Sequence, residues 1–449
     1  MSNDSLADTA RTGLLVSPAE WAHRIGRRLV SRTGVKGALS LVDQALVSAA
    51  NFLASIFVGR FGGPAELGLY FQGFTVIAVL LTAQIALIAV PYTIYSPRKQ
   101  GGKDKTFAGS ALAHQLMLSL AVVALLLLAA LVLWGTLDKP ALAAVTAIVA
   151  VGAPFVLMRE FARRFCFAHM EIGRGLLLDL VTVTGQLAAF VWLSWNGQLT
   201  AVTALAVLAA ACAISGLGWL FVCRREFHLV WKQALADLAH NFSLAMWVFL
   251  SDFGAALIAL SGGVLTIFLL GEREAGIYAA CWTVSQAVNP LLFGTFNLLS
   301  PTAARAYANG GKPEVRRVMF TVTPFIVALL LGWCIFLLLF GELIIQALYG
   351  DDFLSTTWVV TWLAASVLMR ALGVIAGQGL QTIDRPRFGF YSNVLALCGL
   401  ALSVPLLIPT WGVTGAAMCI CAAEATIFVT RMLAFLSLSR APAPCEVPT

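Results

Sequence analysis

Twelve long runs of apolar residues occupy most of this 449-residue chain. Lipid offers the backbone no hydrogen-bond partner, so a spanning segment must satisfy its own N–H and C=O groups, as a helix of about 20 apolar residues does. The runs cover residues 38–60, 68–95, 107–135, 141–165, 175–195, 200–222, 241–270, 275–302, 317–340, 354–382, 388–408 and 412–438. Only 11% of the residues are charged, whereas soluble domains have about a quarter. The sequence therefore predicts an all-α integral membrane protein with about 12 transmembrane helices.

The second half of the chain repeats the first in the same order, at offsets of 208 to 211 residues. The matched pairs are Asp43 with Asp252, Gly68-Leu69-Tyr70 with Gly276-Ile277-Tyr278, Lys103 with Lys312, Arg159 with Arg370, and Arg174 with Arg385. Six helices in each half would give both halves the same orientation in the membrane. We therefore expect two six-helix lobes, related by a parallel internal repeat, around a central cavity.

Polar stretches divide the chain into five parts. We expect a cytoplasmic N-terminal segment (1–37), an N-lobe (38–222), a cytoplasmic linker (223–240), a C-lobe (241–438) and a cytoplasmic tail (439–449). Each boundary follows a change from an apolar run to charged or small polar residues.

The N-terminal segment carries the pattern of an amphipathic helix. Ser17-Pro18-Ala19-Glu20 has the spacing of a capping box, and Trp21, Ile25 and Leu29 share one helical face beside several arginines. This pattern predicts a basic helix that lies on the anionic inner leaflet. The alternative is a solvated basic arm that only enforces the topology.

The basic residues gather on one side of the predicted membrane. Of the 29 Lys and Arg residues, 26 lie in segments on the side of the termini, and only Arg60, Lys139 and Arg273 lie on the other. The positive-inside rule then places both termini in the cytoplasm. Because the basic residues are spread over seven membrane-edge segments, the net charge of +7 does not indicate a nucleic-acid partner.

Signatures of soluble enzymes and of metal sites are missing from the sequence. It has no HExxH, no Walker loop, no GxSxG in a usable context and no CxxC, and of its nine cysteines only Cys419 and Cys421 are close together. We therefore expect no catalytic residue, no metal, no disulfide framework and no enzymatic activity.

Polar side chains form stripes on two of the predicted membrane helices. They are Gln44, Ser48 and Asn51 in the first span, and Trp282, Gln286 and Asn289 in the eighth. A polar stripe on a membrane helix faces a protein interior or a wet cavity. We expect both stripes to face one central cavity that binds substrate; the alternative for each residue is a hydrogen bond between helices.

Two repeat-related pairs of charged residues are further candidates. Asp43 and Asp252 could exchange a proton or hold Na⁺, or they could be hydrogen-bonded structural acids. Arg159 and Arg370 should lie near the inner membrane edge, where guanidinium groups could bind a phosphate in bidentate fashion. The alternative for this pair is that both arginines are snorkelling topology anchors.

The first hairpin resembles that of a known family. The residues are Asp43-Gln44-Ala45-Leu46, Asn51-Phe52 and the run Gly59-Arg60-Phe61-Gly62-Gly63-Pro64-Ala65-Glu66-Leu67-Gly68-Leu69-Tyr70, with a weaker second copy at Gly271–Tyr278. They are similar to bacterial polysaccharide flippases of the multidrug/oligosaccharidyl-lipid/polysaccharide (MOP) superfamily. The resemblance implies an inner-membrane flippase that moves undecaprenyl-diphosphate-linked oligosaccharide outward by alternating access, for exopolysaccharide, capsule or O-antigen. Family members commonly line the lumen with cations, whereas the mid-membrane lumen expected here is poor in Arg and Lys.

The resemblance also sets the expected partners and alternatives. Lipid-linked oligosaccharide and membrane lipids are the expected partners, with a polysaccharide polymerase and chain-length or export proteins beside them, no cofactor except coupling H⁺ or Na⁺, and a monomeric state. An ion-coupled multidrug or cation antiporter of the same superfamily is the first alternative. A membrane glycosyltransferase or polymerase is disfavoured, because Asp351-Asp352 is the only candidate acidic loop.

Overall fold

The computed structural model describes residues 32–96, 103–169, 171–353 and 356–440, and these ranges are helical without any strand. The helices are α2 (Arg32–Gln84), α3 (Val90–Tyr95), α4 (Lys103–Gly135), α5 (Pro140–Ala168), α6 (Ile172–Trp195), α7 (Ala201–Cys223), α8 (Trp231–Leu269), α9 (Glu272–Ser285), α10 (Asn289–Tyr349), α11 (Thr357–Thr382) and α12 (Arg387–Arg440). A π-helical turn (Ile85–Ala89) joins α2 to α3, and a 3-10 turn (Gln286–Val288) joins α9 to α10.

Three of the long helices reverse direction at a single glycine. The φ angles are 84° at Gly63 in α2, 64° at Gly311 in α10 and 53° at Gly412 in α12. Residues with a side chain rarely adopt this region, so glycine allows a hairpin without a loop. Eight helices of the described ranges are long and apolar enough to cross a membrane. With both arms of each hairpin counted and α8 added, the chain has about 12 spans, as the apolar runs predict.

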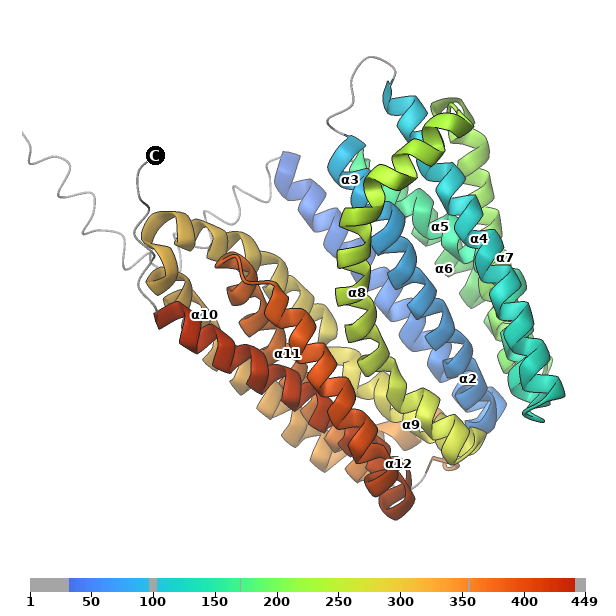
Figure 1. Cartoon of the computed structure of the whole chain (residues 1–449). Coiled ribbons are helices and arrows are strands. Elements are labelled where there is room, and N and C mark those ends of the chain that lie inside the picture. The colour runs from blue at the N-terminus through green and yellow to red at the C-terminus, as the bar shows by residue number, and fades with distance from the viewer. Residues whose placement is uncertain (1–31, 97–102, 170, 354–355, 441–449) are drawn as a thin grey trace, which may run out of the picture.

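Figure 1 shows two helical lobes that meet at one end and separate towards the other. The N-lobe contains α2 and α4 to α7, and the C-lobe contains α9 to α12. Helix α8 lies between the lobes, because it packs on α12 and also on α2 and α4. We call the end with the Gly63 and Gly412 hairpins the closed end. The opposite end carries the α7–α8 connection and the ends of the described chain, and we call it the open end.

Two repeat-related glycines bring the lobes together at the closed end. A Cβ atom on Gly68 of α2 would lie 2.1 Å from the carbonyl oxygen of Glu272 and 2.8 Å from the amide nitrogen of Gly276. A Cβ atom on Gly276 would lie 1.8 Å from the carbonyl oxygen of Pro64. None of these three distances is possible for real atoms. Helices α2 and α9 can therefore cross here only because both positions lack a side chain.

The α7–α8 connection is shorter than the predicted linker 223–240. It comprises residues 224–230, and α8 begins at Trp231, so most of the predicted linker is helical. The polar residues of this segment do not break the helix, because the segment also contains strong helix formers such as Ala and Leu. The predicted amphipathic helix within residues 1–37 lies almost wholly outside the described residues.

Candidate functional site

A cavity of about 530 Å³ lies between the two lobes. Both arms of α2 line one side, and residues of α8, α9, α10 and α11 line the rest. The lining is mostly apolar and aromatic, with Tyr70, Phe71 and Phe74 from the second arm of α2. A cavity of this size can hold several sugar rings or the head of a lipid, and it draws on both copies of the repeat.

The structure places five of the six predicted stripe residues around this cavity. Ser48 and Asn51 line it from α2, and Trp282, Gln286 and Asn289 line it from the broken helix α9–α10. Gln44 is half-buried on the same arm of α2 as Ser48 but is not among the lining residues. The break after Ser285 follows from Pro290, which has no N–H and therefore begins a new helix, α10.

Arg370 of α11 is the charged residue among the described lining residues. Its side chain is 28% exposed, and its guanidinium lies 5.3 Å from the centre of the Trp282 ring, in a cation–π contact. Its Nε donates a hydrogen bond of 2.9 Å to Glu424 of α12, while its Nη2 is buried without a hydrogen-bond partner. The cavity lining therefore combines a cation, an aromatic face and amide groups.

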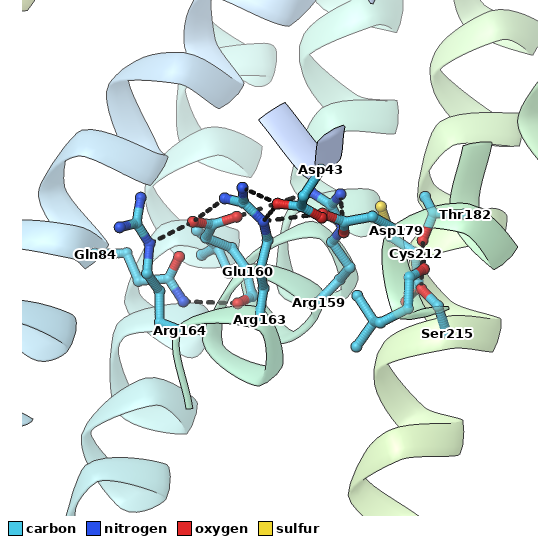
Figure 2. Close-up of polar contacts among 12 residues, drawn as sticks. Asp43, Gln84, Arg159, Glu160, Arg163, Arg164, Asp179, Thr182, Cys212 and Ser215 are labelled. Atoms are coloured by element: carbon cyan, nitrogen blue, oxygen red, sulfur yellow. Dashed lines mark hydrogen bonds and ion pairs between the residues drawn. The ribbon is translucent and has the colours of Figure 1, made fainter. Parts of the chain in front are cut away.

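Arg159 lies elsewhere, inside the N-lobe. Its guanidinium donates a short hydrogen bond to Asp179 of α6, and its side chain is 13% exposed (Figure 2). It is not among the residues that line the cavity. Arg159 and Arg370 therefore do not form the predicted pair at the inner opening of the cavity. The physical reason is that a buried acid on α6 binds Arg159, whereas the acid that binds Arg370 leaves part of its guanidinium beside the cavity.

Asp43 is also part of the N-lobe interior. Its Oδ2 accepts hydrogen bonds of 2.6 and 3.2 Å from Arg163 of α5, and Arg163 Nε lies 2.9 Å from Asp179 Oδ2. Asp43 and Asp179 are both fully buried. Asp252, the repeat-related partner of Asp43, falls in α8, and its side chain lies outside the described residues.

Glu160 completes this buried charge network, which Figure 2 shows in one layer across α2, α5 and α6. It accepts a hydrogen bond of 2.7 Å from Arg164 and lies 3.6 Å from Arg163. The network contains three arginines and three acids, so its formal charges cancel. Desolvated charges are tolerated when each has a partner, and the network ties three membrane helices to one another.

Hydrogen bonds close the cavity towards the closed end. Ser55 of α2 lies 3.1 Å from the hydroxyl of Thr283 and 3.1 Å from that of Tyr349, and both of these residues belong to the C-lobe. Arg60 donates a hydrogen bond of 2.7 Å to the carbonyl oxygen of Ala347 at the end of α10. These contacts join the lobes, so this conformation gives a substrate no path through the closed end.

Some residues at the site carry little signal in the sequence. Thr75, Tyr70 and Phe71 line the cavity, yet they sit in an apolar run without a polar stripe. Glu424 is an isolated acid in a membrane helix, and such an acid signals that a cation lies nearby. Spacing along the chain does not say which cation, because Glu424 and Arg370 are 54 positions apart.

Comparisons with known proteins give the family. The chain matches the family model described as polysaccharide biosynthesis protein over residues 96–357, more than half of its length. The probable low-salt glycan biosynthesis flippase Agl15 of Haloferax volcanii is 20% identical over 189 residues, 42% of this chain and 40% of that protein. The chain thus matches less than half the length of this curated relative.

Solved structures share the fold at low identity. An inward-facing multidrug resistance MATE family transporter of the MOP superfamily has a TM-score of 0.71 at 15% identity, covering 87% of this chain and 94% of that one. The lipid II flippase MurJ in an inward closed conformation has a TM-score of 0.70 at 12% identity, covering 90% of both chains. These likenesses agree with the two lobes and the intervening cavity. The chain therefore belongs to the polysaccharide biosynthesis protein family, and it shares its fold with a MATE transporter and with MurJ.

Proposed function

We propose that this protein is a flippase that moves an undecaprenyl-diphosphate-linked oligosaccharide across the bacterial inner membrane for a surface polysaccharide. The observation that carries the proposal is the chemistry of the cavity between the lobes. Hydroxyl and amide groups of Ser48, Asn51 and Asn289 suit sugar hydroxyls, the Trp282 ring suits a sugar face, and Arg370 suits a phosphate. The matched family and the relative named a glycan flippase support the same substrate class.

The two ends of the molecule support outward transport as part of this proposal. The positive-inside bias assigns the open end to the cytoplasm, together with both termini. A cavity that is closed by Ser55, Thr283 and Tyr349 at the other end would then receive a substrate assembled on the cytoplasmic side. Reporter fusions at each terminus test this orientation. At both termini, a reporter that works only in the cytoplasm should be active, and a reporter that works only outside it should be inactive.

Coupling to H⁺ or Na⁺ is part of the proposal, with Asp43 and Asp252 as the candidate residues. Asp43 is already paired with Arg163, so a coupling ion at Asp43 would have to compete with a guanidinium. Transport into vesicles with an imposed pH or Na⁺ gradient tests this step. Asp43→Asn should remove the response to the gradient if Asp43 carries the ion.

A multidrug antiporter is the second candidate, because a MATE transporter shares the fold. Cationic drugs need an acid or an aromatic cage in the binding site. Trp282 and several Phe and Tyr rings line the cavity, but none of its described lining residues is an acid, and Arg370 would repel a cation. The cavity therefore favours a neutral or anionic substrate.

The deciding experiment is translocation of a fluorescent lipid-linked oligosaccharide in proteoliposomes that contain the purified protein. We expect movement between leaflets in the wild type and its loss in Asn51→Trp, because a large side chain would fill the cavity. A radiolabelled sugar nucleotide added to the same vesicles should yield no new glycosidic bond. Export of ethidium without movement of the lipid-linked oligosaccharide would instead establish the antiporter.

A further inference from the structure

We propose that Glu424 sets how tightly the cavity holds the phosphate of its substrate, because Glu424 and that phosphate share the guanidinium of Arg370. The inference rests on the proposed function for the identity of the ligand, a lipid diphosphate. It concerns a residue outside the cavity lining, and it assigns Glu424 a role as a positioning residue that acts through Arg370.

The ion pair leaves one edge of the guanidinium available. Glu424 Oε1 accepts from Nε at 2.9 Å, and Nη2 is buried without a partner. Glu424 is only 6% exposed in its side chain and does not line the cavity, whereas Arg370 does. The acid therefore binds the Nε side of the guanidinium, and a ligand in the cavity would approach the part of the 28% exposed side chain that Glu424 does not bind.

A second donor belongs to the same cavity lining as Arg370. Gln286 uses its Oε1 to accept a hydrogen bond of 2.7 Å from Asn289, and its Nε2 is buried without a partner. Unpaired buried donors are unfavourable, so a side-chain rotation that brings Nη2 of Arg370 or Nε2 of Gln286 to an acceptor in the cavity gains a hydrogen bond. A phosphate has several acceptor oxygens and can satisfy donors from two helices at once.

Glu424 lowers the affinity for such an anion by electrostatic repulsion. The Arg370–Glu424 pair has no net charge, so a phosphate that binds Arg370 meets a carboxylate that is bound to the same guanidinium. The other described charged group that interacts with Glu424 is Arg431, seven positions later on α12, which hydrogen-bonds to Ser392 and Asn393 instead. A transporter must release its substrate, and weak binding of this kind favours release.

The same arrangement fixes the ligand geometry. Trp282 covers the guanidinium at 5.3 Å, so the ring restricts a ligand to the plane of the guanidinium edge. Planar, edge-on binding suits the two oxygens of a phosphate better than a single hydroxyl of a sugar. The phosphate end of the carrier is thereby placed at α11, and the sugars towards Ser48 and Asn51.

Binding of undecaprenyl diphosphate to the full-length protein in nanodiscs tests the inference. Glu424→Gln keeps the shape and removes the charge, so we expect an affinity about tenfold higher than wild type. Glu424→Ala should shift the affinity in the same direction. In the proteoliposome assay, Glu424→Gln should lower both KM and kcat, because substrate binds more tightly and leaves more slowly. A merely structural role would weaken binding instead.

The matched control is Asp179→Asn, the same neutralisation at the repeat-related arginine Arg159. It should lower the melting temperature, because Arg159 and Arg163 lose a buried partner, whereas the protein that remains folded should keep the wild-type affinity for undecaprenyl diphosphate. Equal or weaker binding in both Glu424→Gln and Glu424→Ala, at unchanged thermal stability, would overturn the inference. Failure of the wild type to move lipid-linked oligosaccharide would count against the proposed function alone, since the binding comparison does not depend on translocation.

Discussion

Arg159 and Arg370 occupy matching positions in the two lobes and have different surroundings. Both follow the same three residues, Val-Leu-Met, and they are 211 positions apart. Arg159 is enclosed among charges from three helices, and Arg370 lines the cavity beneath Trp282. The repeat therefore places an arginine at the same position in each lobe. The side chains around that arginine determine whether it stabilises the lobe or lines the cavity.

The neighbours can be compared position by position. Glu160, Arg163 and Arg164 of α5 correspond, at the same offset of 211, to Ala371, Val374 and Ile375 of α11. The N-lobe thus has a neutral network of six charges, and among the described residues the corresponding arginine of the C-lobe, Arg370, pairs with Glu424. A substrate with a charged end and a sugar end has no internal symmetry, so the two lobes are free to differ where they contact it.

The largest expected effect comes from breaking the N-lobe network. Arg163→Gln would leave Asp43 buried without its partner, and removal of one partner of a buried ion pair costs about 3–5 kcal/mol. We expect a clear fall in the melting temperature of the purified protein and a low yield of folded material. The double variant Asp43→Asn/Arg163→Gln should recover part of this loss. Equal melting temperatures for Arg163→Gln and wild type would show that the network does not stabilise the fold.

The next effect separates the two arginines. Arg370→Gln should retain the fold but reduce substrate affinity by roughly 10- to 150-fold, as expected for a lost charge-assisted contact of about 1.5–3 kcal/mol. Arg370→Lys keeps the charge without the fork, so it should recover only part of the transport. Arg159→Gln should show the opposite pattern, with a larger fall in the melting temperature than in substrate affinity. Transport and melting temperature, measured on all three variants, decide whether the arginines differ as described.

The smallest effect concerns the closed end. Tyr349→Phe removes one hydroxyl from the contact with Ser55, which contributes about 0.5–1.5 kcal/mol. A cysteine at an otherwise unreactive cavity position, such as Ala49→Cys in a cysteine-free background, should then become more reactive towards a membrane-impermeant thiol reagent added from outside. Phe57→Leu, which alters packing and no hydrogen bond, serves as a comparison. Unchanged labelling in Tyr349→Phe would show that the hydroxyl does not hold the lobes together.

Most of the fold follows from the sequence because lipid imposes simple rules. The apolar runs predict the helices, and their even number and the basic residues predict the topology. The exact joints do not follow: Gly63 and Gly412 form hairpins without loops, and residues 231–240 continue α8 where charge suggested a linker. Such details depend on backbone conformation and on packing against α4, which hydropathy does not report.

The site follows from the sequence only where side chains are periodic. Ser48, Asn51, Gln286 and Asn289 recur at helical spacing, and a polar stripe must face away from lipid. Charge pairing depends on contacts between helices. The sequence therefore indicates that Arg159 needs an acidic partner, but it does not show that the partner is Asp179. For the same reason, the difference between Arg159 and Arg370 is invisible in two identical Val-Leu-Met-Arg segments.

The crossing of Gly68 and Gly276 also limits how the two halves can evolve. It lies where each copy of the repeat meets the other, so a duplicated chain has to keep both glycines at once, whereas positions away from this crossing can change in one copy alone. A side chain gained by either copy would push the neighbouring backbone aside, because its Cβ atom would lie 2.1 Å or less from a carbonyl oxygen. Sterically, substitution is therefore most restricted at this crossing, and changes to the residues that line the cavity leave the crossing intact.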